Sequence, residues 1–119
     1  MKLDDKIRTR RVAYLLKGEQ STAFELAMLY YILATRKNSD DKITDACRKS
    51  AQWLQVAGVQ VSDHVKRLNP AELLDNIEHI LVANKAMICQ PDKAVGADAL
   101  VHATPIFNRG LGLAYTYNR

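Results

Sequence analysis

The side chains best suited to metal binding or catalysis are scattered along this sequence. The three histidines, His64, His79 and His102, stand in separate segments with no His-x-x-x-His or Glu-x-x-His spacing, so the paired helical ligands typical of zinc enzymes are not formed. Cys47 and Cys89 have no CxxC spacing, which argues against a zinc site or a disulfide scaffold. We expect two free thiols and no bound metal.

Two further motifs give no support for catalysis. Glu72, Asp75 and Glu78 gather near the start of one expected helix, where carboxylates favour the helix dipole without any acid–base chemistry. Gly110 and Gly112 neither follow a strand nor complete a GxGxxG motif, so no nucleotide site is indicated. We therefore expect a non-enzymatic protein without a cofactor.

Residues 57–68, AGVQVSDHVKRL, resemble the turn and second helix of a DNA-reading helix-turn-helix. That motif joins two helices through a tight turn that commonly contains glycine, and Gly58 stands at this place. The bulky Leu54, four residues earlier, and the negative charge of Asp63 argue instead for a structural corner between two helices. In the DNA-reading interpretation, the side chains near the bases are His64, Lys66 and Arg67.

Positive charge concentrates near the N-terminus. The chain has 17 Lys and Arg against 13 Asp and Glu, a net charge of +4. Lys2, Lys6, Arg8, Arg10, Arg11 and Lys17 all fall in the first seventeen residues. This cluster is consistent with a solvated helix face, a phosphate-binding patch or a docking surface for an acidic protein. In the phosphate-binding interpretation, the contacting residues are Arg8, Arg10, Arg11, Arg48 and Lys49.

The last residues, 106–119, combine aromatic rings with positive charge. Their sequence, IFNRGLGLAYTYNR, contains two glycines and alternating apolar residues, a pattern that favours an extended segment over a helix. Such an arm could fold back over its own core, lie along a partner or a second subunit, or stack on bases. The residues expected to make these contacts are Arg109, Tyr115 and Tyr117.

Apolar residues recur at helical spacing through most of the chain. The pattern predicts helices over 3–17, from a cap at Ser21 or Thr22 to about 34, over 43–57, over 62–68 and from 70 to about 88. In the first of these, the apolar side is expected to comprise Leu3, Ile7, Tyr14, Leu15 and Leu16. Gly18 is expected to end it, and beyond residue 91 only 97–102 could form a further turn or two.

Two of these helices have strong local signals. The segment NPAE at 69–72 places Asn at the N-cap, Pro at the first helical position and Glu at the third. The helix that follows is expected to bury Leu73, Ile77, Ile80, Leu81, Asn84 and Ile88. The run 24–34 is apolar on nearly all sides, so we expect it at the centre of the fold.

Composition indicates a folded chain with one core. It is 48% hydrophobic and 25% charged, as in ordinary globular domains. The longest apolar run, 26–34, is shorter than the roughly 18 residues of a membrane span, and the charged N-terminus does not resemble an export signal, so we expect a cytoplasmic protein. The predicted fold is all-α, a compact bundle of four or five helices over 1–105 with an extended C-terminal arm over 106–119.

Two functions are compatible with this pattern. The first is a small helical interaction protein, an adaptor, inhibitor or assembly subunit of the size common among phage and plasmid accessory proteins. It would bind a protein partner, or a second copy, through its basic helical face and its arm. The alternative is a dimeric helix-turn-helix-like regulator of transcription that binds DNA.

Overall fold

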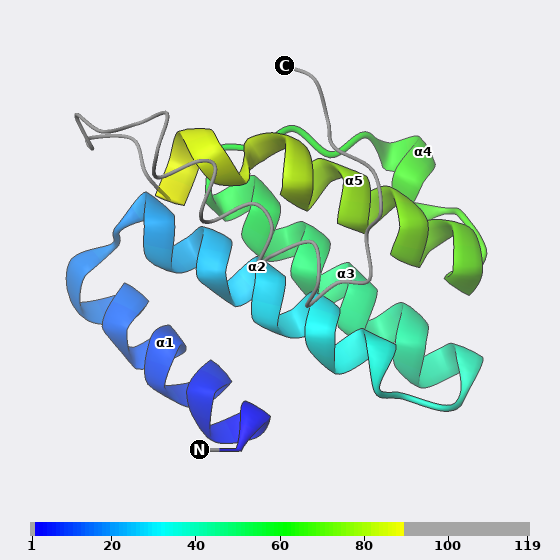
Figure 1. The fold of residues 1–119 in the computed structure, drawn as a ribbon, viewed down its shortest axis with the longest axis horizontal. Coiled ribbons are helices and arrows are strands. Elements are labelled where there is room, and N and C mark those ends of the chain that lie inside the picture. Colours follow the sequence, from blue (N-terminus) through cyan, green and yellow to red (C-terminus); the bar gives the residue numbers. More distant parts are fainter. Residues whose placement is uncertain (1, 90–119) are drawn as a thin grey trace.

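The computed structural model describes residues 2–89, and in this range it contains five α-helices and no strand. These are α1 (Leu3–Lys17), α2 (Gln20–Thr35), α3 (Asp40–Val56), α4 (Asp63–Lys66) and α5 (Pro70–Cys89) (Figure 1). The all-α bundle is therefore confirmed. The expected turns at 97–102 and the arm at 106–119 lie outside the described residues.

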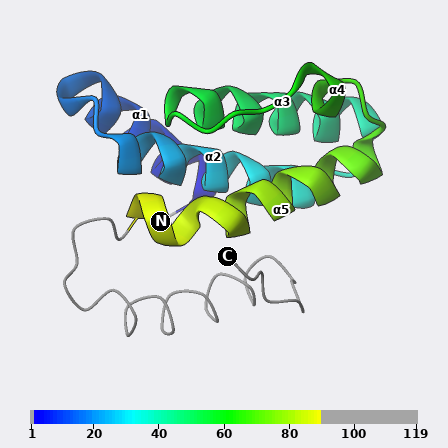
Figure 2. The same cartoon turned by 90° about the horizontal axis from the view of Figure 1, so that it is seen from above.

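Helix α2 occupies the centre of the bundle, with α1, α3 and α5 packed around it (Figures 1 and 2). Phe24, Leu26 and Ala27 are completely buried although they point to different sides of the helix. A helix that is apolar nearly all round needs neighbours on more than one face. The central position expected for this segment is confirmed.

Small residues let α2 and α3 approach each other closely. Alanines recur along the facing sides of the two helices, and Ser50 of α3 is completely buried among them. The Ser50 hydroxyl donates a hydrogen bond of 2.7 Å to the Ala27 carbonyl oxygen of α2. This contact satisfies the only polar group of the Ser50 side chain and holds the two backbones together.

Enlarging residue 50 should therefore force the two central helices apart. Ser50→Leu is expected to lower the free energy of unfolding by about 1–3 kcal/mol, because a close-packed core has no room for the added methylene groups. Ser50→Ala, which removes only the hydrogen bond, should cost about 1 kcal/mol. Urea denaturation followed by circular dichroism measures both. Equal losses in the two variants would show that side-chain volume at residue 50 is unimportant.

Most helix ends follow local signals, but α2 and α3 both begin earlier than expected. Helix α3 starts at Asp40 instead of residue 43, with the Ser39 side chain as its N-cap. Gly18 ends α1 in the left-handed conformation, with φ 64°, and Asn69 accepts a hydrogen bond of 2.9 Å from the Glu72 backbone N–H at the start of α5, as predicted. The predicted cap of α2 at Ser21 or Thr22 is wrong, because the helix already begins at Gln20. Backbone hydrogen bonds from Thr22 and Ala23 to the Glu19 carbonyl oxygen close this first turn, and the Gln20 side-chain amide donates a hydrogen bond of 2.7 Å to the Ala57 carbonyl oxygen beyond α3.

Candidate binding surface

Helix α1 is held against both of its neighbours by side chains from its inner side. Ile7 is buried between α1 and α2, and Arg10 of α1 lies 3.7 Å from the Glu25 carboxylate of α2. The rings of Tyr14 and Trp53 meet edge to face, with their centroids 5.3 Å apart. This last contact ties the end of α1 to the end of α3 and sets the width of the space between them.

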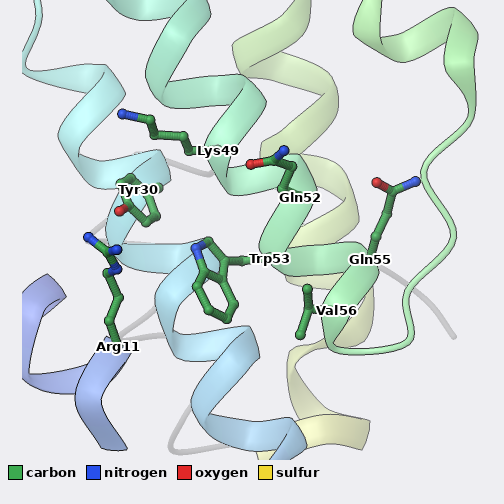
Figure 3. A pocket seen from close by; sticks show the side chains of 7 residues that line it. All are labelled: Arg11, Tyr30, Lys49, Gln52, Trp53, Gln55 and Val56. Carbon is green, nitrogen blue, oxygen red and sulfur yellow. The ribbon is translucent and has the colours of Figure 1, made fainter. Parts of the chain in front are cut away.

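A hollow of about 730 Å³ opens between α1 and α3, and we call it the α1–α3 groove (Figure 3). Arg11 lines it from α1, Tyr30 of α2 forms its floor, and the α3 side contributes Lys49, Gln52, Trp53, Gln55 and Val56. Lys49, Trp53 and Val56 are spaced by four and three residues and so share one side of α3. The groove thus brings together positive charge, amide groups and an indole ring.

The cations beside the groove are available for contacts with another molecule. No carboxylate within residues 2–89 forms an ion pair with Arg11. Arg8 pairs with Asp5 at 3.1 Å and Lys49 with Asp45 at 3.2 Å, but all four side chains are about half exposed or more. Ion pairs in water are worth little, so a partner's acidic groups could replace these two carboxylates at small cost.

Apolar side chains continue this surface over the outside of α1. Leu15 is 81% exposed and Leu16 79% exposed, and Val12 and Val56 are about half exposed. The prediction that Leu15 and Leu16 belong to the inner side of α1 is wrong. Successive helical residues are rotated by about 100°, so Ile7 and Tyr14 share the buried side while the two leucines turn away from it.

Residues 57–68 do not form the geometry expected of a helix-turn-helix. The connection between α3 and α4 spans residues 57–62, and α4 has only 4 residues, a single turn. Buried Val61 secures the connection to the core. Lys66 donates a hydrogen bond of 3.2 Å to the Gln55 side chain, which directs it back onto α3.

The structure separates the residues predicted to bind a partner into several groups. Arg11 and Lys49 line the α1–α3 groove, and Arg8 stands one helical turn before Arg11 on α1. Arg10 turns to α2 and Arg48 is exposed on α3. His64, Lys66 and Arg67 belong to the α4 region, which packs on α5 across α3 from α1 (Figure 1). Arg109, Tyr115 and Tyr117 lie outside the described residues.

Sequence reasoning missed the aromatic and aliphatic part of this surface. Tyr30 was indistinguishable from its apolar neighbours in the α2 run, and Leu15 and Leu16 looked like core residues. Trp53 did give a signal, because it stands beside the apolar stripe of α3 and four residues after Lys49. A large aromatic residue one helical turn from a cation is typical of binding surfaces.

Chemistry within residues 2–89 offers no sign of a catalytic centre. No group of three His, Cys, Asp or Glu side chains in this range is placed to hold a metal ion. Cys47 is completely buried, and burial raises the pKa of its thiol to about 12, so it stays protonated and is a poor nucleophile.

None of the helices described is long and apolar enough to cross a membrane.

Glu78 is the carboxylate whose environment differs most from expectation. The sequence placed it with Glu72 and Asp75 near the start of α5, yet Glu78 is buried, only 9% exposed. Burial, and then the nearby Asp75 carboxylate, raise the pKa of the Glu78 carboxyl group above its ordinary value, while His79 and the Tyr31 hydroxyl act in the opposite direction. Burial and Glu78 also raise the pKa of the Tyr31 phenol.

This burial should make stability depend on pH. Because the folded pKa of Glu78 is raised, the folded protein keeps that proton at pH values where the unfolded chain has lost it. Stability from this group therefore falls as pH rises from about 4.5 through the folded pKa. Glu78→Gln removes this pH-dependent contribution to stability. The melting temperature of the variant should therefore exceed that of wild type by more at pH 7 than at pH 4.5. An unchanged difference between the two pH values would contradict the assignment, and exposed Glu19→Gln is the control.

Comparison with known proteins gives no relative for this chain. No family model, no curated protein and no solved structure matches it. The surface is therefore interpreted from its own geometry and chemistry.

Proposed function

We propose that this protein is a non-enzymatic helical interaction protein that binds a macromolecular partner through the α1–α3 groove and the outer side of α1. The observation that supports this most is the exposure of two adjacent leucines, Leu15 and Leu16, at about four fifths of their surface. Clustered exposed apolar side chains mark interaction surfaces. Arg11 and Trp53 beside them are of the residue types that contribute most to binding at protein interfaces.

The extent of this surface favours a macromolecule over a small ligand. A small molecule binds in a hollow that encloses most of its surface, whereas Val12 and Leu16 lie on the outer side of α1, beyond the residues that line the groove. A partner must cover both the groove and the helix beside it to bury these groups. This is the contact pattern of a protein surface or a helix laid across α1.

In this proposal the protein acts in the cytoplasm as an adaptor, an inhibitor or an assembly subunit, of the kind that phages and plasmids encode. The arm at 106–119 would add a second contact through Arg109, Tyr115 and Tyr117, or would hold a second copy of the chain. Its two arginines and three aromatic side chains support that role.

Substitution of the exposed leucines tests the proposal. Full-length wild type and Leu15→Asp/Leu16→Asp are immobilised and exposed to extract of the source cells, and each captured partner is then purified and titrated. Met87→Asp is the matched control, because Met87 is also exposed, at 71%, but lies on α5. We expect the double variant to lose at least tenfold in affinity and the control to bind like wild type.

Two results would overturn the proposal. In the first, all three proteins bind the same partner equally, so that α1 is not the interface. In the second, duplex DNA binds tightly in fluorescence anisotropy with a steep dependence on salt and competes with the captured partner. That result would favour the alternative, a DNA-binding regulator.

A further inference from the structure

The two helices that border the α1–α3 groove both change from charged to apolar residues in the same direction along their sequences. Helices α1 and α3 run the same way, each antiparallel to α2 (Figure 1). On α1, Arg11 lines the groove, with Arg8 about one helical turn before it and Leu15 about one turn after it; on α3, Lys49 precedes Trp53 and Val56 in the lining. The Tyr14–Trp53 contact places the final turns of the two helices together. We call the end toward Arg11 and Lys49 the cationic end of the groove and the end toward Trp53 and Val56 its apolar end; the Gln52 and Gln55 amides line the groove as well.

The dimensions of this pattern suit a short helix. Arg8 and Leu15 are seven residues apart, which corresponds to roughly 10 Å along a helix. A partner helix of about two turns would cover this length with residues at i, i+3, i+4 and i+7. Its acidic side chains would lie near Arg8, Arg11 and Lys49, and its apolar ones near Leu15, Trp53 and Val56.

Charge favours an acidic helix of a partner over the chain's own C-terminal arm as the occupant of the groove. Residues 104–119 contain two arginines and no aspartate or glutamate, so the arm offers no side-chain carboxylate to the cationic end. Duplex DNA matches the surface less well. Affinity for DNA depends on many phosphate contacts, and phosphates would leave the apolar end of the groove in water.

We propose that the α1–α3 groove binds an acidic amphipathic helix of a partner protein, with its carboxylates at Arg8, Arg11 and Lys49 and its apolar side chains at Leu15, Trp53 and Val56. This inference rests on the proposed function and specifies the class of its partner. It predicts that the groove selects negative charge followed by apolar residues along one helix face.

A random-peptide display library screened against the full-length protein tests this directly. The enriched peptides are expected to contain two or more acidic residues one helical turn before two apolar residues. A synthetic peptide of the enriched sequence should lose at least tenfold in affinity for Arg11→Glu/Lys49→Glu. It should bind Arg36→Glu/Arg48→Glu, in which exposed cations outside the groove are reversed, within about twofold of wild type.

A charge exchange completes the test. The same peptide with lysine in place of its acidic residues should fail to bind wild type and should bind Arg11→Glu/Lys49→Glu, whose helicity is checked by circular dichroism. Enriched peptides without acidic residues, or equal binding to both reversal variants, would overturn the inference. If duplex DNA displaces the peptide, the inference is overturned in favour of DNA as the occupant. If wild type forms a dimer and Arg11→Glu/Lys49→Glu does not, it is overturned in favour of a second copy of the chain. The proposed function is tested separately: if Leu15→Asp/Leu16→Asp loses affinity for the cellular partner, that proposal stands even when the acidic-helix inference fails.

Discussion

Phe24→Ala is expected to lower the free energy of unfolding by about 3–5 kcal/mol. Phe24 is completely buried in the largest core cluster, where α2 meets α3 and α5. Removing the ring withdraws a large apolar surface and leaves a cavity that three packed helices cannot fill. Since small domains are stable by only about 5–15 kcal/mol, the variant should be close to unfolded at 37 °C.

Chemical denaturation with urea, followed by circular dichroism, measures this loss. Leu16→Ala is the control, because Leu16 is 79% exposed and its truncation should change stability by no more than about 0.5 kcal/mol. A loss below about 1 kcal/mol for Phe24→Ala would contradict the packing of α2 described above. A large loss for Leu16→Ala would contradict the exposure of the outer side of α1.

Trp53→Ala is expected to weaken partner binding by about thirtyfold or more, the equivalent of at least 2 kcal/mol at an interface hot spot. The indole lies in the wall of the α1–α3 groove, near Arg11 and Tyr30 (Figure 3). Its ring system is the largest side chain among the residues that line the groove. Titration calorimetry with the purified partner, or with the selected acidic peptide, measures the change.

Trp53 also contacts Tyr14, so the loss needs a control that separates binding from the position of α1. Tyr14→Leu removes the ring contact of 5.3 Å but leaves the indole in the groove. If Trp53 contacts the partner directly, Tyr14→Leu should retain most of the affinity and Trp53→Phe should lose only part of it. An equal loss in Tyr14→Leu and Trp53→Ala would show that Trp53 acts by positioning α1.

The candidate site was predictable only in part. The positive charge of Arg11 and Lys49 was visible in the sequence, but their meeting at one groove depends on α1 and α3 both packing against α2. Leu15 and Leu16 were misassigned because the spacing of apolar residues along a sequence does not show how wide a face of the helix is covered by the neighbouring helix. Helix α2 covers only a narrow stripe of α1, from Ile7 to Tyr14.

What the sequence by itself determined is the set of helices and most of their ends. Gly18, Ser39 and Asn69 act on backbone groups within a few residues, and apolar spacing within one helix is likewise local, so both can be inferred without a fold. Only the tertiary structure decided which sides are covered. The burial of Glu78, the exposure of Leu15 and the groove beside Trp53 depend on contacts between helices distant in sequence, because packing is a property of pairs of helices.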